Sequence, residues 1–195
     1  LFKSNKRYFI FCTAKGKISL ESKNKTILVT ASAKRLGKFI AIDLIKKGWK
    51  VAIHYNKSKI LAEDTADHLF KIGGNVSTHQ ADLTCNSDIE KLVNEIEAQD
   101  SKWVGIINNA GYFNYDDGNS FKVEELHRHM SVNFIAPTLL TKALAKYTMK
   151  MTKKENSSQG FVINILDAKI FGLNPDYYTY TCLLYTSPSP RDQSG

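Results

Sequence analysis

The chain has 195 residues, of which 43% are hydrophobic, and its formal net charge is +8. This length and composition are typical of one globular domain with a substantial core. No run approaches the roughly 18 consecutive apolar residues of a membrane-spanning helix, so we expect no membrane partner. Seven basic residues and one acidic residue fall within residues 1–25, which leaves a net charge of only +2 for the remainder. We therefore expect no basic face for nucleic acid.

The N-terminal stretch 1–25 is predicted to be a basic extension without structure, or sequence foreign to the domain. Its apolar run, Tyr8–Cys12, is shorter than the roughly seven to fifteen residues of a signal-peptide core. Cys12, Cys85 and Cys182 have no metal or redox spacing, and their odd number fits free thiols in a reducing compartment. These features predict a cytoplasmic protein without a bound metal.

The segment 26–48 predicts a strand, a tight turn and a helix. The β-prone residues 26–30 lead through small residues into 34–47, where apolar side chains recur at helical spacing before Gly48. A second strand is predicted at 51–53. Together they form a βαβ unit, which in doubly wound folds places a dinucleotide pyrophosphate at the N-terminus of the first helix.

The rest of the chain continues to alternate between helices and strands. Helices are predicted at 61–72, after Ser87 and at 124–149, and strands at 75–80, 104–107 and 161–166. This order predicts an α/β fold, a Rossmann-like doubly wound parallel sheet truncated after the fifth strand. We expect Ser87 and Glu90 to form a capping box. Pro137 lacks a backbone N–H and should bend the last helix near Asn133.

Small or polar residues follow each predicted strand at its carboxyl end, where ligands bind in such sheets. These residues are 31–35, 56–58, 82–83, 108–111 and Asp167. Their convergence at one edge of the sheet predicts a ligand site.

Several motifs resemble the short-chain dehydrogenase/reductase family, and within it the pteridine reductases and their dihydrofolate- or dihydromonapterin-reducing relatives. The motifs are TASAKRLG at 30–37, HYNKS at 54–58, NNAG at 108–111, and Asp167 thirteen residues before Tyr180. The resemblance covers residues 26–181, which it implies form an NADP-binding domain. The usual turn of the family is Thr-Gly-x-x-x-Gly-x-Gly, so Ala31 and Arg35 replace two of its glycines and only Gly37 remains.

The resemblance implies NADPH as the cofactor. NAD enzymes carry a carboxylate about twenty residues after the glycine turn, whereas Lys57 stands there in this chain and would attract a 2′-phosphate. A solvated loop lysine is the alternative. The implied cofactor contacts are Arg35, Leu36 and Gly37 at the pyrophosphate, Asn56, Lys57 and Ser58 at the 2′-phosphate, Asp82 and Leu83 at the adenine, Asn109, Ala110 and Gly111 at the ribose and nicotinamide, and Asn133, which resembles an asparagine that holds a structural water.

The resemblance also implies the chemistry. Tyr180 matches the family's general acid, and an unperturbed phenol, with a pKa of about 10, is neutral at pH 7 and able to donate a proton. Asp167 replaces the usual serine and could bond the amino and ring nitrogens of a pterin, or simply cap its strand. Phe113 stands where an aromatic side chain stacks on the pterin, or it packs in a core or lid. The implied function is NADPH-dependent reduction of a pterin or dihydrofolate-like substrate, by a homo-oligomer when full-length.

Two features depart from the family. The tyrosine is normally followed four residues later by a lysine, and Leu184 stands there. Residues 182–195 contain Pro188 and Pro190 among serines, so we interpret them as a non-homologous tail that truncates the domain. As written, the chain is expected to be inactive. Two alternatives stay open: a 3-ketoacyl or other carbonyl reductase of the same fold, and a catalytically inactive dinucleotide-binding module.

Overall fold

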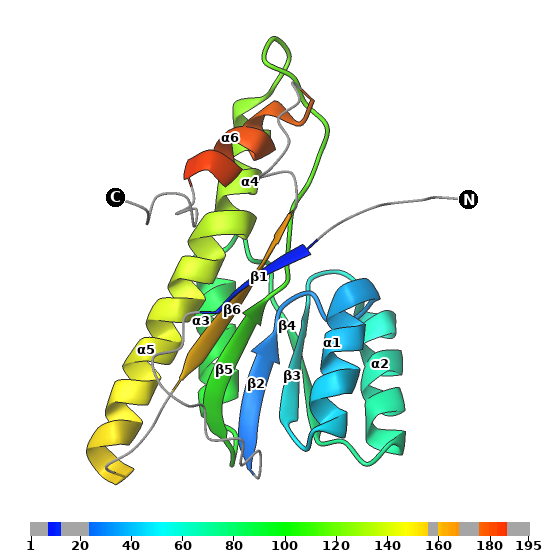
Figure 1. The fold of residues 1–195 in the computed structure, drawn as a ribbon, viewed down its shortest axis with the longest axis vertical. Helices are drawn as coiled ribbons and strands as arrows, with labels where there is room; N and C mark the ends of the chain where they lie inside the picture. The colour runs from blue at the N-terminus through cyan, green and yellow to red at the C-terminus, as the bar shows by residue number, and fades with distance from the viewer. Residues whose placement is uncertain (1–7, 13–23, 156–159, 168–175, 187–195) are drawn as a thin grey trace.

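The structure, a computed structural model, describes residues 8–12, 24–155, 160–167 and 176–186 (Figure 1). The other parts of the predicted basic extension and of the predicted tail lie outside these residues. Helices and strands alternate along the described chain. In order, they are β1 (Tyr8–Cys12), β2 (Lys25–Val29), α1 (Arg35–Lys46), β3 (Lys50–Tyr55), α2 (Lys59–Lys71), β4 (Val76–Gln80), α3 (Asn86–Glu97), β5 (Lys102–Asn108), α4 (Val123–Met130), the π-helical turn η1 (Ser131–Ile135), α5 (Ala136–Glu155), β6 (Phe161–Asp167) and α6 (Tyr178–Thr186).

The strands form one sheet in the order β1-β6-β5-β2-β3-β4. The five predicted strands, β2 to β6, pair in parallel, which confirms the doubly wound sheet. After β4 the chain crosses to the other side of β2 to form β5, so the strand order reverses between β2 and β5. Ligands bind at such a reversal. Ala31 and Asn109 follow these two strands and therefore lie at the expected binding point.

The expectation that residues 1–25 lack structure is wrong for Tyr8–Cys12. This segment forms β1, which pairs antiparallel with β6 from Tyr8 opposite Asp167 to Cys12 opposite Ile163. Without β1, β6 would present an unpaired row of backbone N–H and C=O groups at the sheet edge. A short run of aromatic and β-branched residues suits this pairing, and its five residues are an ordinary strand length.

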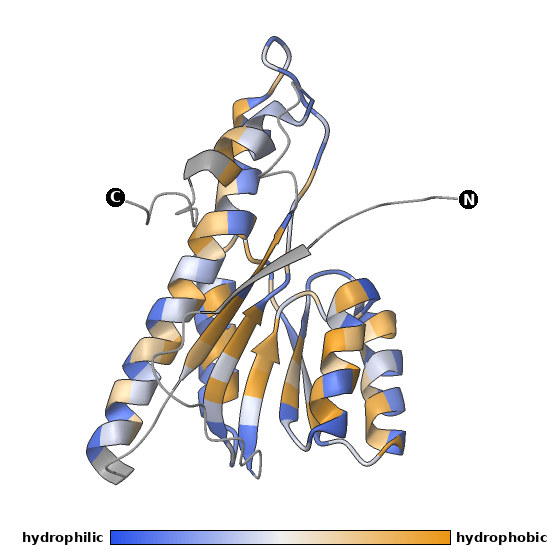
Figure 2. Cartoon of the chain, in the orientation of Figure 1, coloured by the Kyte–Doolittle hydropathy of each residue, from blue (hydrophilic) through white to orange (hydrophobic). Residues whose placement is uncertain are grey.

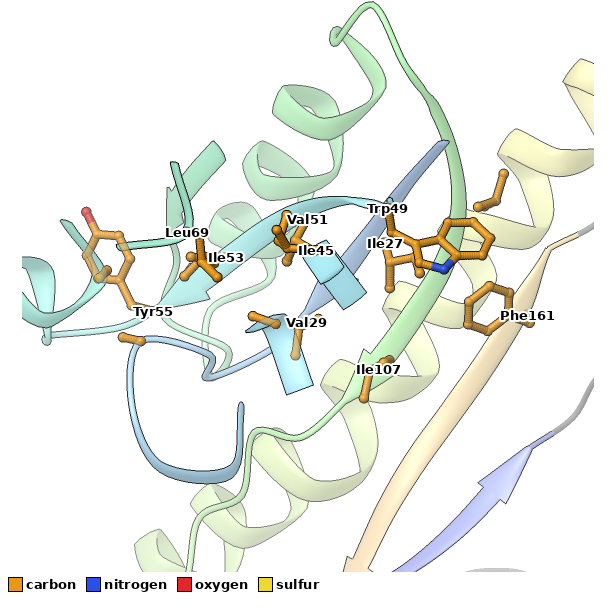
Figure 3. Close-up of a cluster of buried hydrophobic side chains, with 14 residues drawn as sticks. Ile27, Val29, Ile45, Trp49, Val51, Ile53, Tyr55, Leu69, Ile107 and Phe161 are labelled. Atoms are coloured by element: carbon orange, nitrogen blue, oxygen red, sulfur yellow. The ribbon is translucent and has the colours of Figure 1, made fainter. Parts of the chain in front are cut away.

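Hydrophobic cores fill both faces of the sheet. Figure 2 shows apolar residues along the central strands and polar residues on the outer sides of the helices. Along β2, Ile27 and Val29 pack toward α1 and α2, whereas Leu28 packs toward α3 and α5. In the first cluster, Trp49 and Phe161 meet edge to face with their ring centroids 6.4 Å apart (Figure 3). Because both faces are covered, the central strands are continuously apolar, as their sequences suggested.

Helix α3 begins differently from the prediction. Its N-cap is Cys85, no side chain caps it, and Ser87 lies inside the first turn with its hydroxyl 3.1 Å from the Cys85 Sγ. The predicted capping box between Ser87 and Glu90 is therefore wrong. Asp88, in the first turn of α3, instead stabilises the preceding loop, because its Oδ2 accepts the Asp82 N–H at 2.9 Å.

The long helix is interrupted near Asn133, at the position where the sequence predicts a bend. Helices α4 and α5 are joined by the π-helical turn η1, which contains Asn133, and Pro137 lies in the first turn of α5. A wider turn at this point suits a proline, which has no N–H to donate. The Asn133 side chain accepts the Tyr112 N–H at 2.9 Å and donates to the Tyr112 carbonyl at 2.8 Å. The π-helical turn is thus bonded to the loop after β5.

The close packing of Phe161 on β5 makes a test of this core. A Cβ at Gly105 would lie 2.4 Å from the Phe161 ring, and neither the strand nor the ring can move freely. We expect Gly105→Ala to lower the free energy of unfolding by about 1–3 kcal/mol, measured by urea denaturation. Gly118→Ala is the control, because its Cβ meets nothing closer than 3.9 Å. Equal stability of the two variants would contradict this packing.

Candidate active site

A cavity of about 600 Å³ lies at the carboxyl ends of β2, β5 and β6. Ten residues predicted from the sequence line it: Arg35, Leu36, Gly37, Asn109, Ala110, Gly111, Phe113, Asn133, Asp167 and Tyr180. The sequence motifs therefore do converge in space. Lys34 and Asn108, from the predicted segments 31–35 and 108–111, line it as well, and further lining residues that the sequence did not indicate include Asn164 and Leu183.

The turn after β2 is fixed by bonds from several elements. The Thr30 hydroxyl accepts the N–H groups of Asn109 at 2.9 Å and Ala110 at 2.8 Å. The Asn109 amide donates to the carbonyls of Thr30 at 3.0 Å and Ala31 at 3.2 Å. On the other side, the Thr65 hydroxyl of α2 donates to the Ala33 carbonyl at 2.9 Å. The turn is consequently anchored both to the NNAG segment and to α2.

The turn keeps a left-handed backbone at the two positions where glycines are missing. Ala31 has φ 50° and Arg35 has φ 54°. For residues other than glycine this conformation costs roughly 1–2 kcal/mol. At Gly37, in contrast, no side chain fits, because a Cβ would lie 2.5 Å from the Ala31 carbonyl oxygen and 2.7 Å from the Asn109 Nδ2. The retained glycine is thus the one that close packing requires.

The start of α1 is suited to an anion. Lys34 is the N-cap residue and no side chain caps the helix. Lys34 and Arg35 are both exposed, and both line the cavity. Free N–H groups, the positive end of the helix dipole and two cations therefore meet at one point, which is the arrangement that binds phosphate groups.

His54, at the carboxyl end of β3, lies beneath this turn and is 2% exposed. Its Nδ1 accepts the Ala31 N–H at 3.0 Å, so the ring proton is on Nε2, which donates to the Ala81 carbonyl at 3.1 Å. Burial lowers the pKa of His54 to about 4, against the raising effect of the bond to Ala81. The imidazole is therefore neutral at pH 7. Sequence analysis assigned it no role, although it belongs to the HYNKS motif.

The predicted 2′-phosphate and adenine residues lie outside the cavity lining. Hydrogen bonds from Thr84 and Asn56, together with the Lys57 charge, hold the pKa of Asp82 below its usual value. Asn56, Lys57 and Asp82 are thus neighbours, as the sequence motifs required; Ser58 is the N-cap of α2. The Leu83 side chain is buried in the core, so only its backbone is available to an adenine.

The predicted chemical groups line the part of the cavity beside β6 and α6. Asp167 ends β6, and Tyr180 lies in the first turn of α6. The Phe113 ring stands edge-on to Tyr180 at 4.8 Å and stacks on Tyr177 at 4.0 Å between centroids. Phe113 is 41% exposed and lines the cavity. The Tyr177 ring therefore covers one face of the Phe113 ring, and Phe113 borders the cavity.

A buried polar network that the sequence did not reveal holds α6 in place. Asp116 accepts the N–H and the hydroxyl of Thr179, the residue before Tyr180. His129 Nε2 accepts the Asn114 N–H at 3.2 Å, so its Nδ1 donates to the Thr179 hydroxyl at 2.8 Å. Asp116, His129 and Thr179 are all buried. Since each buried group has a partner, the network orients the helix that carries Tyr180.

Position 184, where the family lysine is expected, is occupied by a leucine in the cavity wall. Leu184 is 9% exposed and Leu183 is 3% exposed, and both line the cavity near Tyr180. The side chain at position 184 can therefore reach the predicted site, but in this chain it brings no charge.

One buried polar atom in the cavity wall lacks a partner within the described residues. Asn108 donates through Nδ2 to the Asn164 Oδ1 at 2.8 Å, while its own Oδ1 accepts nothing. Asn108 and Asn164 both line the cavity. The Oδ1 atom is itself shielded from solvent, so a donor in the cavity does not reach it in this arrangement.

Within the described ranges, no three His, Cys, Asp or Glu side chains form a group that could hold a metal ion. No helix in that part of the chain is both long enough and apolar enough to cross a bilayer. Cys85 and Cys182 are free and exposed.

Several known proteins are similar to this chain in sequence and in fold. The short chain dehydrogenase family model matches residues 25–181. The short-chain dehydrogenase/reductase homolog YusS of Bacillus subtilis is 34% identical over 87 residues, covering 45% of this chain and 80% of YusS. FolM alternative dihydrofolate reductase 1 from Brucella canis, complexed with NADP, superposes with a TM-score of 0.72 at 32% identity, covering 82% of this chain and 62% of FolM. The angucycline C-6 ketoreductase LanV with bound NADP has a TM-score of 0.73 at 25% identity, covering 84% and 63%.

The chain therefore belongs to the short-chain dehydrogenase family, and the similarity to FolM agrees with a resemblance to pteridine reductases. It spans less than two thirds of the length of the FolM and LanV chains.

The neutral His54 makes stability depend on pH. Its pKa is about 4 in the folded chain against 6.5 unfolded, so the unfolded chain takes up the proton first as the pH falls. The stability is complete above pH 6.5 and is lost between 6.5 and about 4, by about 3 kcal/mol. We expect urea denaturation to show this extra loss in the wild type relative to His54→Asn, which does not titrate. All the other titratable groups are common to both proteins, so parallel pH profiles would contradict the assignment.

Proposed function

We propose that this chain carries the cofactor-binding part of an NADPH-dependent reductase, and that its substrate is a pterin or a dihydrofolate-like compound. The observation that carries the proposal is one cavity whose lining includes both the phosphate-type turn at Arg35 and the side chains of Asp167 and Tyr180. The proposed domain is 26–181, in a cytoplasmic protein that forms a homo-oligomer when full-length.

The proposed cofactor is supported by the chain's own residues. Lys34, Arg35 and the uncapped start of α1 fit a pyrophosphate, and Gly37 allows the turn to pack closely on the helix. When bound, NADPH supplies a hydride. The similar structures of FolM and LanV, both of which contain NADP, add to this support.

The proposed roles of the remaining residues follow from their chemistry. Tyr180 donates a proton to the substrate atom next to the one that receives hydride. Asp167 accepts hydrogen bonds from amino and ring N–H groups of a pterin, which a serine cannot do as strongly. Phe113 offers its ring to the planar substrate. Asn109, Ala110 and Gly111 border the ribose and nicotinamide, and Asn133 fixes the Tyr112 backbone beside them.

The two alternatives rest on different observations. The similarity to the ketoreductase LanV favours a carbonyl substrate. The presence of Asp167 in place of the usual serine disfavours it. The leucine at position 184 favours a dinucleotide-binding module without activity, because a lysine there would assist Tyr180 electrostatically.

The choice of cofactor is tested at Lys57. We expect the wild type to bind NADPH more tightly than NADH in a fluorescence titration, and Lys57→Glu to reduce that preference by roughly tenfold or more, since a charged hydrogen bond to phosphate is lost. Lys71→Glu is the matched control: it makes the same charge change at the far end of α2, about 18 Å along the helix. A similar loss of preference in both variants would count against a specific phosphate contact.

Activity is tested at position 184. A lysine there would lie on the same helix face as Tyr180, so we expect Leu184→Lys to raise the rate of NADPH oxidation with dihydrofolate at least tenfold. Leu184→Gln controls for polarity without charge, and adding Tyr180→Phe should remove the gain.

The same assay separates the alternatives. A gain with a 3-ketoacyl thioester and none with dihydrofolate would favour the carbonyl reductase. NADPH binding without a gain for either substrate would favour the inactive module. An equal gain in Leu184→Gln would exclude the electrostatic explanation.

A further inference from the structure

We propose that His54 is a positioning residue for the dinucleotide, one that holds Ala31 in its left-handed conformation and so fixes the turn against the start of α1. The inference rests on the proposed binding of NADPH. It gives a role to a residue for which the sequence offered none.

His54 contacts two consecutive amides of the turn. Its ring Nδ1 accepts the Ala31 N–H, and its backbone carbonyl accepts the Ser32 N–H, both at 3.0 Å. The ring Nε2 donates to the Ala81 carbonyl at 3.1 Å, immediately before Asp82. A single buried side chain thus joins the proposed pyrophosphate turn to the loop proposed to hold the adenine.

The strain at Ala31 gives this contact its importance. An alanine at φ 50° would relax to negative φ unless neighbouring bonds opposed it. Relaxation would rotate the peptide groups of Ala31 and break its N–H bond to His54. The bond therefore stabilises the conformation that a glycine at position 31 would adopt almost without cost.

The position of the Ala31 carbonyl connects this conformation to α1. The oxygen accepts the Asn109 amide at 3.2 Å and lies 2.5 Å from where a Cβ of Gly37 would be. Any rotation at Ala31 would move this oxygen against α1 or away from Asn109. The helix start that is proposed to face the pyrophosphate thus depends on the His54 ring.

Two substitutions separate the two ring contacts. In His54→Asn, the amide oxygen takes the place of Nδ1 and keeps an acceptor for Ala31. In His54→Gln, the longer amide reaches toward Ala81 and leaves Ala31 without an acceptor. We expect His54→Gln to weaken NADPH binding roughly tenfold and His54→Asn to weaken it by less than about threefold, the difference one hydrogen bond makes.

A double variant tests whether the strain at Ala31 is the reason for the loss of affinity. In the Ala31→Gly background, His54→Gln should weaken binding by less than about threefold, because glycine adopts the turn without strain. Dissociation constants are measured by fluorescence titration at a temperature where every variant is folded by circular dichroism. A purely structural role would lower the melting temperatures of the Asn and Gln variants without this selective rescue of affinity.

The outcomes distinguish the two proposals. If the wild type binds NADPH and both His54 variants bind equally well or equally badly, His54 has no positioning role, and the proposed function stands. Failure of Ala31→Gly to reduce the loss in His54→Gln overturns it as well. A folded wild type without saturable NADPH binding overturns both proposals.

Discussion

The backbone of the turn at 30–33 is the constraint on which the rest of the site depends. It is held by Asn109 from the segment after β5, His54 from β3 and Thr65 from α2. Each bond joins the turn to a different part of the parallel sheet or its helices. Because the strand order reverses beside this turn, the same bonds fix the backbone at the point where the cavity is lined by Ala31 and Asn109.

The cavity has two chemically different ends. Near α1 it presents Lys34 and Arg35 and the free amides of a helix start, an environment for negative charge. Near α6 it presents Asp167, aromatic rings, Leu183 and Leu184. The first end is made by residues close together in the sequence, whereas the second needs β6 and α6 to be brought to the same place. The two ends therefore depend on the fold to different degrees.

Much of the fold was predictable because its signals are local. Alternating strands and helices, the interruption of the long helix near Asn133 and the convergence of strand ends all follow from periodicity or from a single proline. The partner of Tyr8–Cys12 could not be predicted, since β1 pairs with a strand at the far end of the chain. The contacts of His54, and of Thr179 with Asp116 and His129, are tertiary for the same reason. Leu83 shows that a motif position does not reveal which atoms face a ligand.

The pairing of β1 with β6 has a consequence for how the protein reaches its final form. Tyr8 lies opposite Asp167, which is proposed to bind the substrate. The backbone of Asp167 is therefore bordered by a strand from the opposite end of the described chain. During synthesis β1 emerges first and must wait for nearly all the other strands before its partner exists. The pairing therefore cannot form before β6 has been synthesised. The sheet edge beside Asp167 is thus completed only after all six strands of the described chain have been made.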